Sequence, residues 1–214
     1  MDMLQTTDDA VGKRETNRIR NRNAILAAAR ECFREKGYDN STIRDIVRRT
    51  GLAAGTFYNY FSSKQDIFAA LLTDFLNRLN TDLNQYRQTS ATARDFIHTT
   101  YLALFMATAD DPLVYQLAHR NDHAIRDLFG SDLLGLAMLS LEEDIRNAVE
   151  RELLPDVDQH YLCAAFSGVA YEMSLRVAER THESPDKGEH EARQAAHFAS
   201  TLFMGGLTQL STLS

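Results

Sequence analysis

The sequence contains no tryptophan, only three prolines and only two cysteines among its 214 residues. The scarcity of proline leaves long stretches in which helices can run uninterrupted. Cys32 and Cys163 lie far apart within apolar helical patterns, so we expect buried, reduced thiols and no disulfide. No apolar run approaches the roughly 18 residues that a membrane-spanning helix needs. The N-terminus lacks the basic and apolar segments of a secretory signal, and we expect a cytoplasmic protein.

Acidic residues outnumber basic ones, giving a net charge of −7, but the charges are unevenly distributed. Residues 12–64 hold twelve Lys and Arg against five Asp and Glu, whereas residues 65–214 hold eleven against twenty-two. A short basic block on an acidic body is typical of a separate nucleic-acid-binding module. Phosphates would repel the acidic body, which restricts DNA contact to the basic block.

The spacing of apolar residues is helical along most of the chain, and no strand-like alternation of any length occurs. We predict a flexible tail over residues 1–14 and a first helix from about Asn17 to Lys36. Two short helices follow, over about 42–50 and 53–60, and a long helix begins at about Ser63. Further helices are predicted near 92–108, 112–120, 122–129, 132–153, 157–182 and 189–210.

Four of these helix starts carry capping signals, in which a side chain accepts a hydrogen bond from the first turn. They are Thr42 with Asp45, Ser63 with Asp66, Asp111 before Pro112, and Asp156 with Gln159. The two short helices are joined by Gly51-Leu52, which is helix-turn-helix spacing. The sequence therefore predicts an all-α protein with a three-helix helix-turn-helix domain over residues 15–64 and a larger helical domain over residues 65–214.

The stretch TIRDIVRRTGLAAGTFYNYFSSKQD, from Thr42 to Asp66, resembles the DNA-binding signature of the tetracycline-repressor (TetR) family. The helix before it is similar too, so the resemblance covers about residues 17–70. It implies a transcription regulator, most simply a repressor, that binds a palindromic DNA operator as a homodimer and is released by a small effector. It also implies dimerisation through the helices over 157–182 and 189–210, which are rich in Ala and Gly.

Carried over to this chain, the resemblance implies a set of DNA contacts, with base edges read by the second short helix. The candidates are Thr42, Arg44, Ala54, Gly55, Thr56, Tyr58, Asn59, Tyr60 and Lys64. Ala53 and Ala54 offer no polar group, so specificity would depend on Arg44, Thr56 and Tyr58. Phe57 and Phe61 are expected in the core. Two sets of arginines remain open: Arg18, Arg20 and Arg22 form either a DNA-contacting arm or a solubilising helix start, and Arg48 and Arg49 either approach DNA or line a solvated helix face.

The larger domain is rich in aromatic residues and methionine between residues 92 and 180, which suits either a plain core or a ligand pocket. The candidate pocket residues are Phe96, Tyr101, Phe105, Tyr115, His119, Phe129, Met138, Phe166, Tyr171 and Met173. Between residues 95 and 150 the only basic residues are Arg120, Arg126 and Arg146, so a mainly apolar effector is expected. No cofactor or metal is expected, because a helix break separates His119 from His123.

Two alternatives to an effector-gated regulator are considered. A small helical enzyme would need a nucleophile, a metal or a phosphate-binding loop, and no such motif is present. An architectural DNA-binding protein without an effector would not need a second domain of this size. We therefore expect a protein that is not an enzyme.

Overall fold

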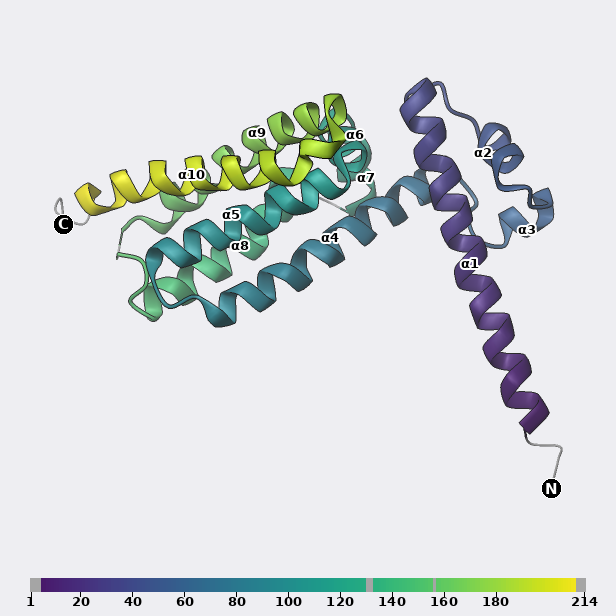
Figure 1. The fold of residues 1–214 in the computed structure, drawn as a ribbon, viewed down its shortest axis with the longest axis horizontal. Helices are drawn as coiled ribbons and strands as arrows, with labels where there is room; N and C mark the ends of the chain where they lie inside the picture. The colour runs from purple at the N-terminus through teal and green to yellow at the C-terminus, as the bar shows by residue number, and fades with distance from the viewer. Residues whose placement is uncertain (1–4, 130–132, 156, 211–214) are drawn as a thin grey trace. The chain divides into compact units, whose positions relative to one another are not determined.

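The computed structural model describes residues 5–129, 133–155 and 157–210. All regular elements in these residues are helices, which confirms the all-α prediction (Figure 1). They are α1 (Gln5–Lys36), α2 (Ile43–Thr50), α3 (Ala54–Tyr58), α4 (Lys64–Thr89), α5 (Ala93–Asp110), α6 (Pro112–Arg120), α7 (Asp122–Phe129), α8 (Leu133–Glu150), α9 (Gln159–Glu183), the 3-10 turn η1 (Pro185–Lys187) and α10 (Gly188–Leu210). The chain forms two compact units, unit 1 (Met1–Leu71) and unit 2 (Leu72–Ser214).

Unit 1 is held together by a small apolar core. Ile25 and Cys32 on α1, Ile46 on α2, Phe57 on α3 and Phe68 on α4 are all fully buried. Phe61 is 7% exposed, so both phenylalanines of the motif are core residues, as the sequence predicted. Burial of a side chain as large as phenylalanine contributes about 1.5–3 kcal/mol. The core thereby fixes α2 and α3 against α1.

The helix ends of unit 1 follow the predicted capping chemistry. Thr42 accepts a hydrogen bond from the backbone N–H of Asp45, whose carboxylate accepts one from the backbone N–H of Thr42. Ser63 and Asp66 repeat this reciprocal pair at the start of α4. Gly51 ends α2 with a φ of 67°, a left-handed conformation that costs glycine little. This residue makes the sharp turn into α3 possible.

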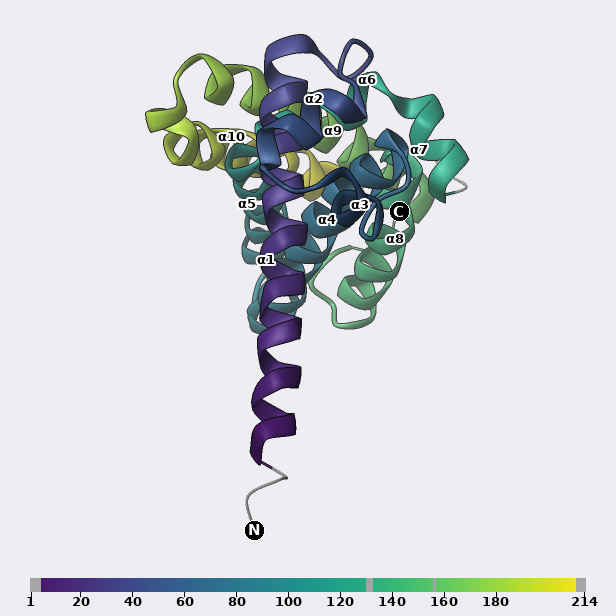
Figure 2. The ribbon, with the colours of Figure 1, turned by 90° about the vertical axis from the view of Figure 1, so that its right-hand side faces the viewer.

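The start of α1 differs from the prediction. The helix extends to Gln5, so the described part of the predicted tail, residues 5–14, is helical. Residues 5–16 carry no apolar period, and without that period the sequence does not predict a helix there. Once the later turns have formed, each added residue gains a backbone hydrogen bond without a new nucleation cost. Figure 2 shows α1 continuing well beyond α2 and α3 within unit 1.

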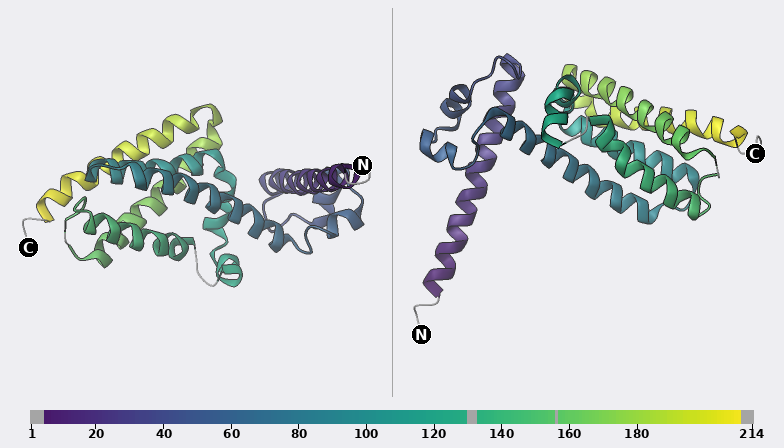
Figure 3. Two further views of the ribbon diagram at one scale, coloured as in Figure 1. Left: turned by 90° about the horizontal axis from the view of Figure 1, so that it is seen from below. Right: turned by 180° about the vertical axis from the view of Figure 1, so that it is seen from behind.

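Unit 2 is a helical bundle in which α5 packs against α9 and α10, and α9 also packs against α6 and α8 (Figure 3). Its core contains the aromatic rings of Tyr101, Phe105 and Phe166. Tyr101 and Phe166 stack with their ring centroids 4.2 Å apart, and the Tyr101 hydroxyl donates a hydrogen bond to the Phe166 carbonyl oxygen. Cys163 is buried and free, as is Cys32 in unit 1, which confirms the prediction of unpaired thiols.

The start of α9 corrects one capping prediction. The cap of α9 is Asp158, whose carboxylate accepts hydrogen bonds from the backbone N–H groups of His160 and Tyr161. Asp156, the predicted cap, lies outside the described residues. Asp111 and Pro112 stand at the cap and first position of α6 as predicted, but the Asp111 carboxylate makes no capping bond and instead pairs with Arg78. None of the described helices has the length and apolar character needed to cross a membrane.

Candidate nucleic-acid interface

The predicted DNA-contacting residues lie on the part of unit 1 formed by α2, α3 and the start of α4. Six of the nine are exposed: Thr42, Arg44, Ala54, Gly55, Tyr58 and Asn59. Thr56, Tyr60 and Lys64 are half-buried. The exposed set includes the N-terminal residues of α3, where a recognition helix makes its base contacts. The geometry therefore brings these nine residues onto one short segment of unit 1.

Tyr58 is the most exposed large side chain of α3, at 57% of its surface. Its ring packs edge-on against the buried ring of Phe57, with centroids 5.5 Å apart. This contact orients Tyr58 while leaving its surface open to solvent. The hydroxyl of Tyr60, in contrast, accepts a hydrogen bond from the Asn21 side chain on α1. Tyr60 is therefore fixed to α1, and Tyr58 is available to a partner.

Lys64 has a role within the domain that the motif did not reveal. Its ammonium donates hydrogen bonds to the carbonyl oxygens of Tyr38, at 2.7 Å, and Asp39, at 3.2 Å. It also lies 4.3 Å from the centre of the Tyr38 ring, within range of a cation–π interaction. Lys64 therefore joins the start of α4 to the loop after α1. Lys64 and Tyr38 are 26 residues apart, so no local sequence pattern predicts this contact.

The arginines of α2 divide into two groups. Arg49 pairs with Glu31 on α1, at 3.2 Å, and with Glu35 on the same helix. Arg48 is 78% exposed and lies 3.8 Å from Asp45, a distance at which an exposed pair contributes little. Arg49 therefore binds α2 to α1, while Arg48 and Arg44 extend into solvent.

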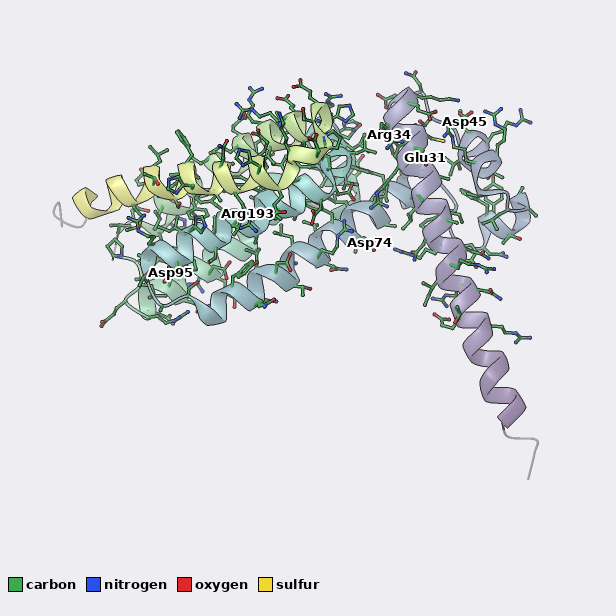
Figure 4. The ribbon with its side chains drawn as sticks, viewed as in Figure 1. Glu31, Arg34, Asp45, Asp74, Asp95 and Arg193 are labelled. Carbon is green, nitrogen blue, oxygen red and sulfur yellow. The ribbon has the colours of Figure 1, made fainter. Side chains whose placement is uncertain are left out.

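Asp45 on α2, labelled in Figure 4, forms a second polar link between α1 and α2 and also holds the cap residue Thr42. The Lys36 ammonium lies 2.6 Å from its carboxylate, and the Thr42 hydroxyl and backbone N–H donate to it as well. These three donors favour the charged form and hold the pKa of Asp45 well below its usual value of 3.8. The same Thr42 hydroxyl must give up its bond to Asp45 before it can donate to a phosphate.

This low pKa predicts an acid-sensitive unit 1. Because the folded-state pKa lies below the unfolded one, the contribution of Asp45 is present above pH 3.8 and is lost as the pH falls below that value. We expect Asp45→Asn to lower the unfolding temperature at pH 7 and to flatten its decline between about pH 5 and 2. Thermal unfolding followed by circular dichroism measures both effects. If the unfolding temperature of Asp45→Asn falls with pH as steeply as that of the wild type, the pH dependence comes from other groups.

The ten candidate effector residues belong to unit 2, and five of them are buried in its interior. Phe96, Tyr101, Phe105, Tyr115 and Phe166 are each at most 4% exposed. His119 and Tyr171 are half-buried and stack on each other with ring centroids 4.6 Å apart. Met173 is half-buried and lines a groove described below. The side chains of Phe129 and Met138 lie outside the described residues.

Among the described side chains of unit 2, three buried polar atoms make no hydrogen bond: His119 Nε2, Ser174 Oγ and Thr181 Oγ1. The Nε2 atom of His119 is buried and makes no hydrogen bond, although its ring is held against Tyr171. A buried polar atom without a partner costs roughly 1–3 kcal/mol, so it favours any bound group that supplies the missing bond. The two histidines considered as metal ligands lie on different helices, His119 on α6 and His123 on α7.

A groove of about 960 Å³ runs between α9 and α10. Its lining includes Met173 and Val177 from α9 and Phe198 and Leu202 from α10. Phe198 and Leu202 are 63% and 57% exposed, although both side chains are large and apolar. Arg176, Arg180 and Arg193 also line the groove. Arg180 pairs with Glu191 of α10 at 3.0 Å, whereas Arg176 and Arg193 pair with glutamates of their own helices. The groove therefore has an apolar floor and charged edges.

Two short helices around a glycine turn, on a basic three-helix unit, define the class of helix-turn-helix DNA-binding regulators. The comparisons with known proteins specify the family. The family model of the bacterial regulatory proteins of the tetR family matches residues 25–71. Residues 25–71 therefore match the DNA-binding region of the TetR-type transcription regulators, as the motif from Thr42 to Asp66 indicated.

Curated relatives are similar mainly through this N-terminal region. The transcriptional activator FasR of Mycolicibacterium smegmatis is 29% identical over 117 residues, which is 53% of each chain. The transcriptional repressor AcnR of Corynebacterium glutamicum is 36% identical over 70 residues, 33% of this chain and 36% of that one. The fatty acid metabolism regulator protein of Bacillus subtilis is 32% identical over 91 residues, 41% and 45% of the two chains. The chain spans about half the length of these relatives or less.

Solved structures match the fold over more of the chain. A TetR-family regulator from Syntrophomonas wolfei superposes with a TM-score of 0.68 at 21% identity, covering 86% of this chain and 95% of that one. The fatty acid degradation regulator FadR of Bacillus halodurans gives a TM-score of 0.63 at 16% identity, covering 83% and 93%. At these identities the likeness establishes the shared fold of both units.

Proposed function

We propose that the protein is a homodimer that binds a palindromic operator through α2 and α3 and releases it when a mainly apolar effector binds unit 2. The observation that carries the first part is the exposure of Tyr58, Arg44 and Asn59 on a rigid, basic unit. Two such units, related by a dimer axis, would place their recognition helices about one DNA turn apart, roughly 34 Å.

The groove between α9 and α10 supports the dimer proposal. Large apolar side chains with more than half of their surface exposed are unfavourable in water and are typical of interaction surfaces. Nearer its start, α9 also presents three small residues that are exposed or half-exposed, Ala164, Ala165 and Gly168. Small residues allow the backbone of a second copy to approach closely. Residues 157–182 and 189–210 are therefore proposed as the dimer contact.

The DNA-contact assignment is tested by Tyr58→Ala and Lys64→Ala. Tyr58→Ala removes an exposed side chain, so we expect operator affinity to fall by about tenfold, which corresponds to one lost base contact, with an unchanged unfolding temperature. Lys64→Ala should also weaken binding, but it removes the contacts to Tyr38 and Asp39 and should cost about 1–2 kcal/mol of stability. Fluorescence anisotropy and thermal unfolding measure the two properties. Wild-type affinity in both variants would reject this surface.

The effector part of the proposal rests on the composition of unit 2. Its core candidates are aromatic, and His119 Nε2 offers one unsatisfied polar anchor. Two similar proteins are named for regulating fatty acid metabolism or degradation, which agrees with an apolar effector. One similar protein is named an activator and another a repressor. We propose repression, and transcription from the bound promoter with and without the protein decides between the two.

A further inference from the structure

The first helix carries arginines well beyond the three-helix core of unit 1. The buried face of α1 is formed by Ile25 and Ala29, both 0% exposed. Positions four residues apart share a face of a helix. Moving toward the N-terminus from Ile25 and Ala29, the same face is occupied by Arg22, Arg18 and Arg14. The face of α1 that is apolar and buried in the three-helix core therefore carries a row of arginines farther toward the N-terminus.

This row of arginines begins beside the recognition helix. Asn21, next to Arg22, donates its side-chain hydrogen bond to the hydroxyl of Tyr60, which directly follows α3. Because α1 is continuous from Gln5 to Lys36, the arginines are held by a helix and not by a loose arm. Arg20 lies about 200° around the helix from Arg18, on the opposite face. The four arginines are therefore not equivalent.

We propose that Arg14, Arg18 and Arg22 form a second DNA-contacting surface, which binds backbone phosphates beside the base pairs reached by α3. The inference rests on the proposed function and specifies more of its DNA contact. From Arg14 to Arg22 the helix rises about 12 Å, a length along which one DNA strand presents about three phosphates. Arg14 is exposed, and Arg18 is 73% exposed and lies 3.8 Å from the carboxylate of Glu15, a long ion pair that a phosphate can replace.

The opposite faces of α1 supply a matched pair of variants. Arg18→Gln and Arg20→Gln remove the same charge two residues apart, from exposed positions of one helix. The probe is a duplex selected by the wild-type, full-length protein from a library of randomised DNA. We expect Arg18→Gln to reduce the slope of log affinity against log salt by about 0.9, and Arg14→Gln with Arg18→Gln by about twice that. Arg20→Gln should keep the wild-type slope.

A third variant should strengthen DNA binding through the same surface, whereas the arginine variants should weaken it. Glu15→Gln removes the carboxylate that pairs with Arg18 and should strengthen binding at low salt. Equal slopes for Arg18→Gln and Arg20→Gln, in variants that unfold at the wild-type temperature, overturn this inference while leaving operator binding through α3 intact. Failure of the wild-type protein to enrich any duplex overturns the proposed function itself, and this inference with it.

Discussion

A single glutamate in the groove between α9 and α10 is expected to convert the protein to a monomer and to weaken operator binding at least a hundredfold. Phe198→Glu places a carboxylate where we propose that a second copy packs, and burying an unpaired charge is strongly unfavourable. In the single chain Phe198 is 63% exposed, so the substitution removes little core packing. The loss of affinity follows because two linked half-site contacts bind about 10²–10⁴ times more tightly than one.

Gly168→Glu tests the same surface from α9. An added Cβ at Gly168 meets no heavy atom within 4 Å, so the single chain can accept the larger side chain. Asn147→Glu is the matched control, because it adds the same charge at an exposed position of α8. Analytical ultracentrifugation should show monomers for Phe198→Glu and Gly168→Glu, and a dimer for Asn147→Glu. A stable dimer in both Phe198→Glu and Gly168→Glu would place the interface elsewhere.

The small residues of α10 show where sequence reasoning about this interface was incomplete. Dimerisation was expected through the Ala- and Gly-rich helix over 189–210, but two of its alanines, Ala196 and Ala199, are fully buried in the core of their own chain, where α10 packs against α5. Alanine suits both situations, so residue type alone does not distinguish them. Among the described large apolar side chains of α10, the exposed ones are Phe198 and Leu202, which a periodicity argument would assign to the core.

Most of the fold was predictable because apolar spacing and capping residues are local signals. Thr42 with Asp45 and Gly51 located α2 closely, and Phe57 and Phe61 are core residues as expected. The contacts that were missed join residues distant in sequence. Lys64 reaches Tyr38, and Arg49 reaches Glu31, and each pair depends on how the helices pack. The candidate DNA residues were therefore found by motif, while their supporting contacts required the structure.

The effector prediction depends on whether the aromatic core of unit 2 can open. Tyr101 and Phe166 stack directly, and Tyr101 also packs near Phe105 and Phe203, so these rings occupy the space that a ligand would need. A bound effector must therefore displace side chains, which reduces its affinity by the cost of opening. This requirement also connects ligand binding to a change in conformation, since a ligand shifts an equilibrium only through differential affinity.

Phe166→Ala should remove the free-energy cost of displacing an aromatic ring before the effector binds. The variant should lose about 3–5 kcal/mol of stability, the usual range for a buried phenylalanine replaced by alanine. The cavity left behind is apolar and can hold an apolar compound without displacing other rings. We therefore expect fatty acids and aromatic compounds to raise the unfolding temperature of Phe166→Ala more than that of the wild type, whereas sugar phosphates and nucleotides raise neither.

Phe57→Ala provides the matched control, because Phe57 is also buried but belongs to the core of unit 1. A compound that merely fills any cavity would stabilise both variants, and an effector of unit 2 should stabilise only Phe166→Ala. The same compounds should release the wild-type protein from its selected duplex in an anisotropy titration, because binding in unit 2 is proposed to disfavour the DNA-bound conformation. Release by a sugar phosphate or nucleotide, with no response to any apolar compound, would reverse the prediction and point to a polar, anion-binding site.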